Sequence, residues 1–500
     1  MLFTNKKHKG KGKKYTFLNN TLEILYISTH IYIKSFLERH IVDLFIVIFY
    51  LISTLFLGIY FGQNIRTLKD FATSSGYSTN VLLATLFATV IGGGSTLGIV
   101  TNVHRYGIIF MFAFMGASFN KYLVAYYAAP KLQKLKHITS LGDVFENSYG
   151  TFGRVISGLC VFFVSVACIG HQTTAIGFVF KSFFGIDFVT GVLLAYGTLV
   201  IYSSFGGIRS VVATDVYQFA LICAFVPIVL LVCLTKIGGI NNFLISIPSN
   251  KIDLATQLTY WPQAITIFFM MLFSGLDPGF IHRLIMAKEV NQGKYITKMT
   301  GHFSFLIFSS MGLIGLCSYI LFPHIESNIA LPHLIKETLP PILKGIAISG
   351  LLATLMSTAD TALHVLGVSV CEDLILTFKS NFTEKQKIAL VRVITTLMGL
   401  LSLGVALYFQ DIFSIMVFAF SFWGPTVLIP FIMILYGYVF ERKELLIGIT
   451  IGLATVVIWT YTLKEYTNLS GFIPGSLFNF VYFVICILKR NLNVQKTYKA

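Results

Sequence analysis

The sequence predicts an all-α integral membrane protein with about thirteen transmembrane helices. Hydrophobic residues make up 55% of the 500 positions and charged residues only 12%, about half of the roughly 25% found in a soluble domain. The apolar residues occur in runs of about twenty, the length that spans ~30 Å of hydrocarbon as a helix. A transmembrane β-barrel would instead show short segments of alternating polarity, so a helix bundle is favoured.

The apolar runs predict the spans in chain order. They cover 41–62, 81–101, 107–129, 153–181, 185–205, 212–234, 261–287, 299–322, 341–367, 386–408, 411–438, 444–463 and 470–488. Together they form one predicted membrane domain, 41–490, between a basic, amphipathic N-terminal extension (1–40) and a short cytoplasmic tail (491–500). Within the extension, Glu23 and His30 favour an interfacial segment over a further span.

The distribution of basic residues predicts the orientation. A formal charge of +16 raises the possibility of nucleic-acid binding, but no recognition motif is present, so no nucleic-acid partner is expected. Most Lys and Arg residues fall in short loops that share one side if the spans alternate. The positive-inside rule makes that side cytoplasmic, with the C-terminus inside and the start of 41–62 outside. The basic stretch 6–14 disagrees with this orientation.

The span over 81–101 is expected to unwind near its middle. Gly92, Gly93 and Gly94 follow one another there, with Ser95 next, and each glycine costs about 1 kcal/mol relative to alanine in a helix. Backbone carbonyls freed by unwinding need a partner in protein, water or an ion. Close helix packing through small residues is the alternative explanation.

A second break is expected at Gly275, Asp277 and Pro278, since the proline removes a helical hydrogen bond. Each broken span opens a block of five spans, at 81–234 and 261–438. Interrupted helices in matching positions of two halves indicate a transporter with a binding site near the membrane midplane. The repeat is inferred from hydropathy, because the two blocks share no periodic identity.

Three hydroxyls occur within about one turn of the span 341–367, on Thr354, Ser357 and Thr358. Together with freed carbonyls, neutral hydroxyls suit a hard cation such as Na+. The alternative is that these hydroxyls bond back to their own helix.

Five segments resemble the sodium/solute symporter family, which includes bacterial proline, pantothenate and sugar symporters. In order and at family spacing they are LFATVIGGGSTLG, YSSFGGIRSVVATDVYQ, RLIMAK, LLATLMSTADTAL followed by CEDL, and SFWGPTVL. The resemblance covers roughly 41–440. It implies about thirteen helices and a leucine-transporter-type core, a 5+5 inverted repeat with two discontinuous helices.

The resemblance also implies site residues. By motif position, the sodium ligands are the carbonyls of Ala88, Ile91 and Thr354 and the hydroxyls of Ser357 and Thr358. Asp215, in the TD motif, is implied on the cytoplasmic release path of the ion; the alternative is an acid that stabilises a helix N-terminus.

Departures from the family pattern leave the solute open. Asp277 stands where many relatives have Gln, and Lys121 either snorkels or pairs with a carboxylate. Trp423 is either an aromatic gate or a core residue, and His171 and Gln172 either face the cavity or form a packed pair. The expected solute cavity contains Gly92, Gly93, Gly94, Ser95, Gln172, Gly275, Asp277 and Trp423.

The combined prediction is a secondary active transporter that functions as a monomer in the cell membrane. In a bacterium this would be the inner membrane. It couples Na+ to the symport of a small organic solute, such as an amino acid or carboxylate, by alternating access. Na+ is the expected coupling ion, with no transition metal and no organic cofactor. A proton-coupled carrier stays open because Asp277 can carry a proton, and a membrane sensor of solute is the other alternative.

An enzyme is not expected, because the chain lacks a metal or nucleophile constellation. The seven cysteines are scattered singly without CxxC spacing, which argues against disulfide frameworks and zinc sites.

Overall fold

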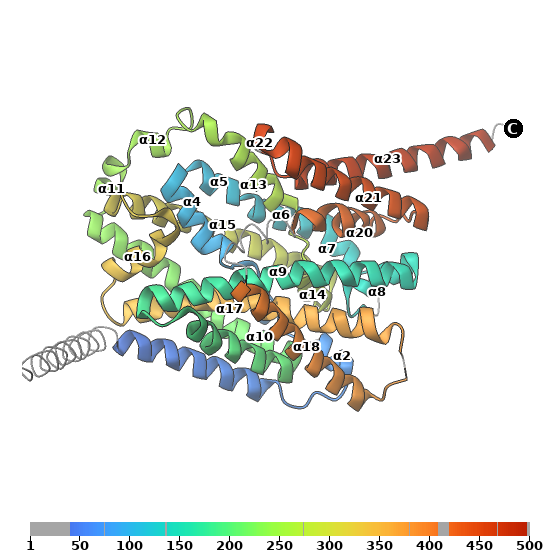
Figure 1. Ribbon diagram of the computed structural model, residues 1–500, viewed down its shortest axis with the longest axis horizontal. Coiled ribbons are helices and arrows are strands. Elements are labelled where there is room, and N and C mark those ends of the chain that lie inside the picture. The colour runs from blue at the N-terminus through green and yellow to red at the C-terminus, as the bar shows by residue number, and fades with distance from the viewer. Residues whose placement is uncertain are drawn as a thin grey trace, which may run out of the picture.

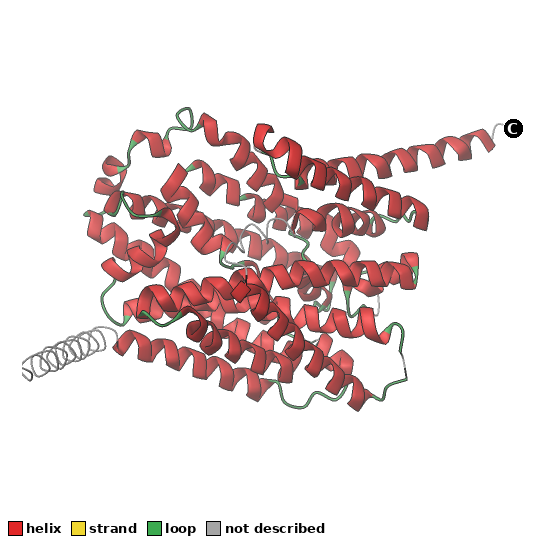
Figure 2. Ribbon diagram, viewed as in Figure 1, coloured by secondary structure: helices red, strands yellow, loops and turns green. Residues whose placement is uncertain are grey.

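The computed structural model describes residues 41–74, 76–135, 138–273, 275–379, 381–408, 420–467 and 469–497. These residues form helices joined by loops, and no strand occurs among them (Figures 1 and 2). The predicted basic extension, 1–40, lies outside the described residues. The last predicted span continues as one helix to Thr497, beyond the predicted start of the tail.

Ten helices of the described chain are long and apolar enough to cross a membrane. Five of them are continuous: Ile41–Phe61, α9 (Thr151–Phe184), α15 (Val290–Leu321), α18 (Glu384–Tyr408) and α23 (Phe472–Thr497). A sixth, α10 (Phe188–Ile237), is kinked at Gly207. Three others are each made of several consecutive elements. One consists of α5 (Ile109–Phe114), α6 (Gly116–Leu123), η2 (Val124–Ala128) and α7 (Ala129–Leu132). The second consists of α17 (Leu343–Ser369) and η5 (Val370–Leu376), and the third of α21 (Arg442–Ile458), η7 (Trp459–Leu463) and α22 (Lys464–Thr467). The tenth is made of η3 (Leu258–Tyr260), α13 (Trp261–Phe273) and α14 (Pro278–Ile285).

One further span is a bent pair, made of α3 (Thr79–Val90) with η1 (Gly94–Gly98) and α4 (Ile99–Tyr106). A shorter apolar helix, Phe420–Leu435, contains η6 (Gly424–Leu428) and α20 (Ile429–Leu435). It corresponds to the predicted span 411–438, whose first part lies outside the described residues. The count of thirteen spans therefore stays a prediction.

Two predicted spans, 185–205 and 212–234, lie within α10, in which two helices follow one another across a kink. The sequence between the spans contains two glycines, and the backbone at Gly207 leaves the helical conformation (φ 50°, ψ −144°). A Cβ at Gly207 would lie 2.7 Å from the carbonyl oxygen of Phe71, and a positive φ is readily adopted by glycine. The two predicted spans are therefore separate helices, and the connection between them is a sharp kink at Gly207.

α17 lies at the centre of the bundle. It packs against α9, α10 and α18, and 83% of its most apolar stretch is buried inside the protein. The first helix lies at the periphery, where Phe45, Phe49, Ile52 and Phe56 are exposed. Apolar side chains spaced along one outward face are suited to contact with lipid.

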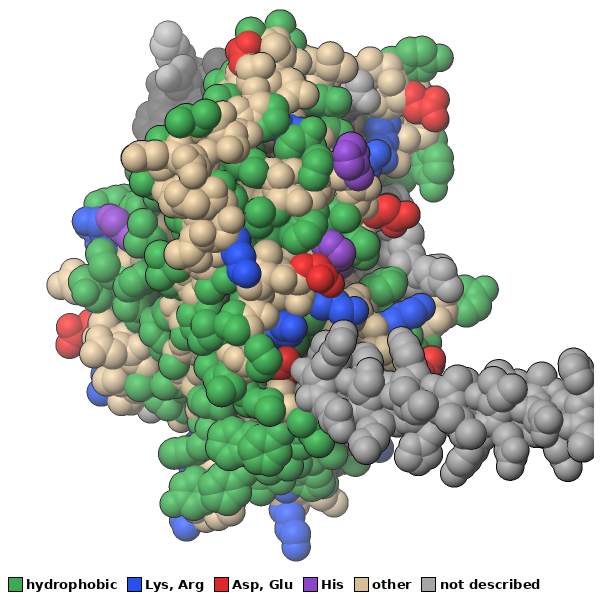
Figure 3. Space-filling view, turned by 90° about the vertical axis from the view of Figure 1, so that its left-hand side faces the viewer, with side chains coloured by type: hydrophobic (Ala, Val, Ile, Leu, Met, Phe, Trp, Pro, Cys, Tyr) green, Lys and Arg blue, Asp and Glu red, His purple; other side chains and the backbone are tan. Residues whose placement is uncertain are grey.

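The shorter helices gather at two opposite ends of the bundle. Figure 1 shows α11 (Ile240–Ser246), α12 (Ser249–Ile252) and α16 (Ala330–Thr338) at one end, and α2 (Leu68–Ala72) and α8 (Leu141–Tyr149) at the other. These are the loops predicted outside and inside, respectively. Figure 3 views the first end, where charged and histidine side chains are interspersed with uncharged surface.

We expect cysteines introduced by Val290→Cys and Glu441→Cys to react with a membrane-impermeant thiol reagent only from the cytoplasm. Ile245→Cys, at a side chain that is 82% exposed, should react only from outside. We expect this result because Lys and Arg are concentrated in the loops of one side, which the positive-inside rule makes cytoplasmic. The parent protein, with its seven native cysteines, gives the background labelling. Reactivity from the opposite sides would reverse the assigned orientation.

Candidate functional site

The first broken helix opens where the glycines predict. α3 and the segment Gly94–Tyr106 meet at 63°, and Ile91, Gly92 and Gly93 between them are not helical. A Cβ at Gly92 would lie 2.8 Å from both Gln172 Nε2 and Thr358 Oγ1. A side chain at position 92 would therefore displace the side chains of Gln172 and Thr358, which approach the break closely.

The backbone groups freed by the break have partners. The N–H of Gly92 donates to Ser95 Oγ at 2.9 Å, and the carbonyl oxygen of Gly92 accepts from the hydroxyls of Ser95 and Thr96, each at 3.0 Å. The N–H of Gly93 donates to Gln172 Oε1 at 3.0 Å. These contacts offset the cost of unsatisfied backbone in the membrane.

The hydroxyls of α17 lie against the carbonyls at the end of α3. Ser357 Oγ is 2.9 Å from the carbonyl oxygen of Ala88 and 3.3 Å from that of Thr354. Thr358 Oγ1 is 3.3 Å from the carbonyl oxygen of Ile91 and 3.2 Å from that of Thr354. The structure therefore brings all five predicted sodium ligands together, as three carbonyl and two hydroxyl oxygens.

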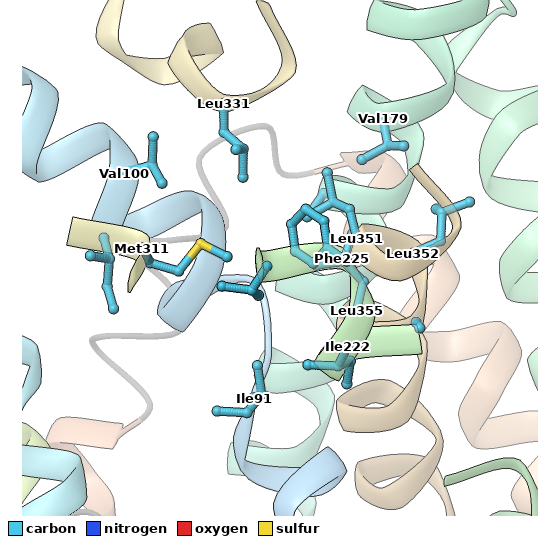
Figure 4. Close-up of a cluster of buried hydrophobic side chains, with 14 of the residues drawn as sticks. Ile91, Val100, Val179, Ile222, Phe225, Met311, Leu331, Leu351, Leu352 and Leu355 are labelled. Carbon is cyan, nitrogen blue, oxygen red and sulfur yellow. The ribbon is translucent and has the colours of Figure 1, made fainter. Parts of the chain in front are cut away.

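Apolar side chains pack beside the end of α3 and the middle of α17. Figure 4 shows Ile91 on the non-helical link, near Ile222 of α10 and Leu355 of α17. All three side chains are completely buried. The burial of these side chains lowers the local dielectric constant, which strengthens the electrostatic interactions of a cation.

A cavity of about 190 Å³ lies between the two broken spans. This is smaller than the roughly 300–1,000 Å³ of pockets that hold drug-sized ligands, so it suits a small solute. Six residues of the expected cavity line it: Gly92, Gly94, Ser95, Gln172, Gly275 and Asp277. Thr358 also lines it, which joins the cavity to the oxygen cluster.

Two residues expected in the cavity lie elsewhere. Gly93 is not among the described lining residues, although its N–H holds Gln172 in place. Trp423 is 1% exposed and belongs to a hydrophobic cluster with Val427 and Phe431. The prediction that Trp423 lines the cavity is therefore wrong in this structure, because the large indole side chain is buried in the core.

The second break places Asp277 at the start of α14. One carboxylate oxygen of Asp277 accepts from the backbone N–H of Phe280 at 2.9 Å. Lys121 on α6 also lines the cavity and is only 2% exposed, so it does not snorkel. In the described part of the chain, no ion pair within 4.0 Å joins Lys121 to a carboxylate.

Asp215 lies inside α10 and is completely buried. It pairs with Arg283, whose Nη2 is 3.0 Å from Asp215 Oδ2. Arg283 also donates from Nε to Thr85 at 2.9 Å and from Nη2 to Thr361 at 2.7 Å, and the Thr85 hydroxyl donates to Asp215. The alternative of an acid at a helix N-terminus is therefore wrong.

Sequence reasoning missed the part played by Arg283, although the residue stands in the RLIMAK segment. It also missed Asp360, which is buried and accepts from Tyr202 OH at 2.6 Å and from the Thr214 hydroxyl at 3.3 Å. A charged residue within an apolar run is a signal that a partner exists. The partner itself lies on another helix and is not marked in the sequence.

A family model described as "Sodium:solute symporter family" matches residues 71–452. The chain belongs to the sodium:solute symporter family. This match confirms the predicted resemblance. It also confirms that the protein is a sodium-coupled symporter of a small solute, not an enzyme, and a multi-pass protein of the cell membrane.

Relatives in this family align over most of the chain. The osmoregulated proline transporter OpuE of Bacillus subtilis (strain 168) is 23% identical, covering 90% of this chain and 95% of the relative. Sodium/proline symporter 2 of Staphylococcus saprophyticus is 24% identical, covering 88% and 91%. These two relatives are therefore matched along almost their whole length.

Solved structures support the fold. A Na+-coupled sialic acid symporter aligns with a TM-score of 0.78 and 18% identity, over 89% of this chain and 97% of that chain. The transporter Mhp1 of the nucleobase-cation-symport-1 family aligns with a TM-score of 0.57 and 15% identity, over 83% and 94%. Both comparisons bear on the helical architecture alone.

Proposed function

We propose that Na+ binds between the first broken helix and α17, and that its gradient drives the uptake of a small organic solute held in the adjacent cavity. The supporting observation is that the hydroxyls of Ser357 and Thr358 lie within 3.3 Å of carbonyl oxygens of Ala88, Ile91 and Thr354. The two hydroxyls now donate hydrogen bonds to these carbonyls. A bound ion would instead be coordinated by the oxygen lone pairs of both the hydroxyls and the carbonyls.

Coupling would follow from the shared wall between the two sites. Thr358 contributes its hydroxyl to the oxygen cluster and also lines the cavity. An ion that draws α17 against the break would stabilise the cavity shape that accepts solute. Solute would in turn stabilise the ion-bound arrangement, because such coupling is reciprocal.

Asp215 would receive the ion on its way to the cytoplasm. The Arg283 guanidinium already pairs with this carboxylate, so a departing Na+ would compete with a fixed cation. That competition would keep Asp215 from trapping the ion.

A polar network would close the cytoplasmic side. Arg154 on α9 pairs with Asp143 at 2.9 Å, with Glu146 at 2.5 Å and with Asp373 at 3.1 Å. These residues come from α8, α9 and η5, three elements that alternating access would have to separate. We infer that ion and solute transport take place in one domain, 41–490, which has thirteen transmembrane helices and a 5+5 inverted-repeat core.

Proline transporters among the relatives favour an amino-acid-sized solute, in agreement with the small cavity. In proteoliposomes, we expect an inward Na+ gradient to drive accumulation of solute from a labelled amino-acid pool. An equal K+ gradient should not, and a Na+ ionophore should abolish accumulation. Counterflow of labelled solute would separate a carrier from a channel. Uptake driven by a proton gradient without Na+ would show that the assignment of Na+ as the coupling ion is wrong.

A further inference from the structure

Two opposite charges lie in the wall of the cavity, a buried Lys121 and a half-buried Asp277. Lys121 comes from α6 and Asp277 from the second break, and both line the same space. Charged groups inside a membrane protein are costly and are normally paired. In the described part of the chain, however, no ion pair within 4.0 Å joins these two residues.

Phe280 holds both charges in place. Its backbone N–H donates to Asp277 at 2.9 Å, and the face of its ring lies 4.4 Å from Lys121 Nζ. A cation over a ring face is stabilised without losing its hydrogen-bond donors. The ammonium and the carboxylate are thus fixed relative to each other, with space of the cavity beside them.

The donors of Lys121 are only partly used. The one hydrogen bond of its ammonium group among the described residues runs to Asn120 Oδ1, at 3.5 Å, whereas an ammonium has three N–H donors. Asn120 in turn donates to the carbonyl of Leu272 at 2.6 Å, at the end of α13. This contact anchors α6 beside the break and sets Lys121 at the cavity.

We propose that the cavity selects a zwitterionic solute of amino-acid size, with its carboxylate at Lys121 and its ammonium group at Asp277. The proposal rests on the function proposed above and names the solute class for the same cavity. A zwitterion would pair with both charges at once. A solute with one charge would leave the other charge of the cavity wall unpaired, which weakens binding.

The test uses the purified full-length protein, with thermal unfolding in nanodiscs as the readout. Na+ is first compared with K+ in the absence of solute. Each of the twenty standard amino acids is then added at saturating Na+, together with the two isosteric analogues that lack one charge. For L-proline these analogues are pyrrolidine and cyclopentanecarboxylate. We expect at least one amino acid to raise the unfolding temperature and its single-charge analogues to have little effect at the same concentration.

The variants Lys121→Met and Asp277→Asn assign the two contacts. Each should weaken zwitterion binding roughly 10- to 100-fold, as expected for loss of a hydrogen bond to a charged group. Lys121→Met should improve the binding of the cationic analogue relative to the zwitterion, and Asp277→Asn that of the anionic analogue. A purely structural role would weaken all three ligands in proportion. Lys294→Met and Asp253→Asn change charges away from the cavity lining and serve as matched controls.

Each contrary outcome is informative. Equal stabilisation by the anionic analogue, unchanged in Asp277→Asn, would show that Asp277 carries a proton instead of contacting solute. Stabilisation by Na+ but by no amino acid would overturn the zwitterion assignment and leave the sodium proposal standing. Absence of stabilisation by Na+ itself would overturn the sodium proposal. The Na+ response of each variant also reports whether it has folded.

Discussion

Replacing Ser357 with alanine should raise the Na+ concentration for half-maximal uptake roughly 10- to 100-fold. The hydroxyl of Ser357 lies 2.9 Å from the Ala88 carbonyl, at the centre of the oxygen cluster. Removing it would take away one ligand and leave α17 intact, because alanine is a good helix former. Uptake measured against Na+ concentration, in proteoliposomes with equal protein content, tests this expectation.

Thr358 provides a second test of the same cluster. Thr358→Ala should raise the half-maximal concentrations of both Na+ and solute, because this residue also lines the cavity. Thr358→Ser should restore much of the Na+ response by returning the hydroxyl. Ser349→Ala is the matched control on α17, since the buried Ser349 hydroxyl has no hydrogen-bond partner among the residues that the structure describes. Wild-type Na+ dependence in both alanine variants would mean that the ion binds elsewhere.

Arg283→Met should destabilise the protein by about 3–5 kcal/mol, the usual cost of removing one partner of a buried ion pair. Asp215 would be left buried opposite an apolar side chain, and Thr85 and Thr361 would each lose a donor. Arg283→Lys should rescue the variant only in part, because an ammonium lacks the planar fork of donors that reaches three acceptors. The expected readout is a lower unfolding temperature together with lost uptake.

The double variant Arg283→Met with Asp215→Asn separates stability from transport. It should recover much of the stability, because no unpaired charge remains, yet stay defective in Na+-driven uptake if Asp215 lies on the ion path. Arg209→Gln is the control, since its pair with Asp70 is long, 3.9 Å, and partly exposed, and such pairs contribute about 0–1 kcal/mol. Normal stability of Arg283→Met would contradict the assigned importance of this pair.

Much of the candidate site could be predicted because its signals are local. The glycines at 92–94 destabilise a helix whatever its tertiary contacts are. The hydroxyls of Ser357 and Thr358 lie within one helical turn. Family motif positions then supplied the Ala88 and Ile91 carbonyls, and the structure places these groups within 3.3 Å of the hydroxyls. By contrast, the predicted place of Trp423 failed, since apolar neighbours along the chain do not reveal whether an aromatic side chain faces a cavity or the core.

The sequence by itself determined that this is a polytopic helical membrane protein, where most of its helices lie, and where two of them break. Hydrophobic length and the backbone costs of glycine and proline are properties of short segments, so they need no knowledge of packing. Only the tertiary structure decided the partners of the buried charges. Arg283 meets Asp215 across 68 residues of sequence, and Lys121 faces the cavity with Asp277 without pairing to it, because the stable partner of a buried charge depends on which helices pack side by side.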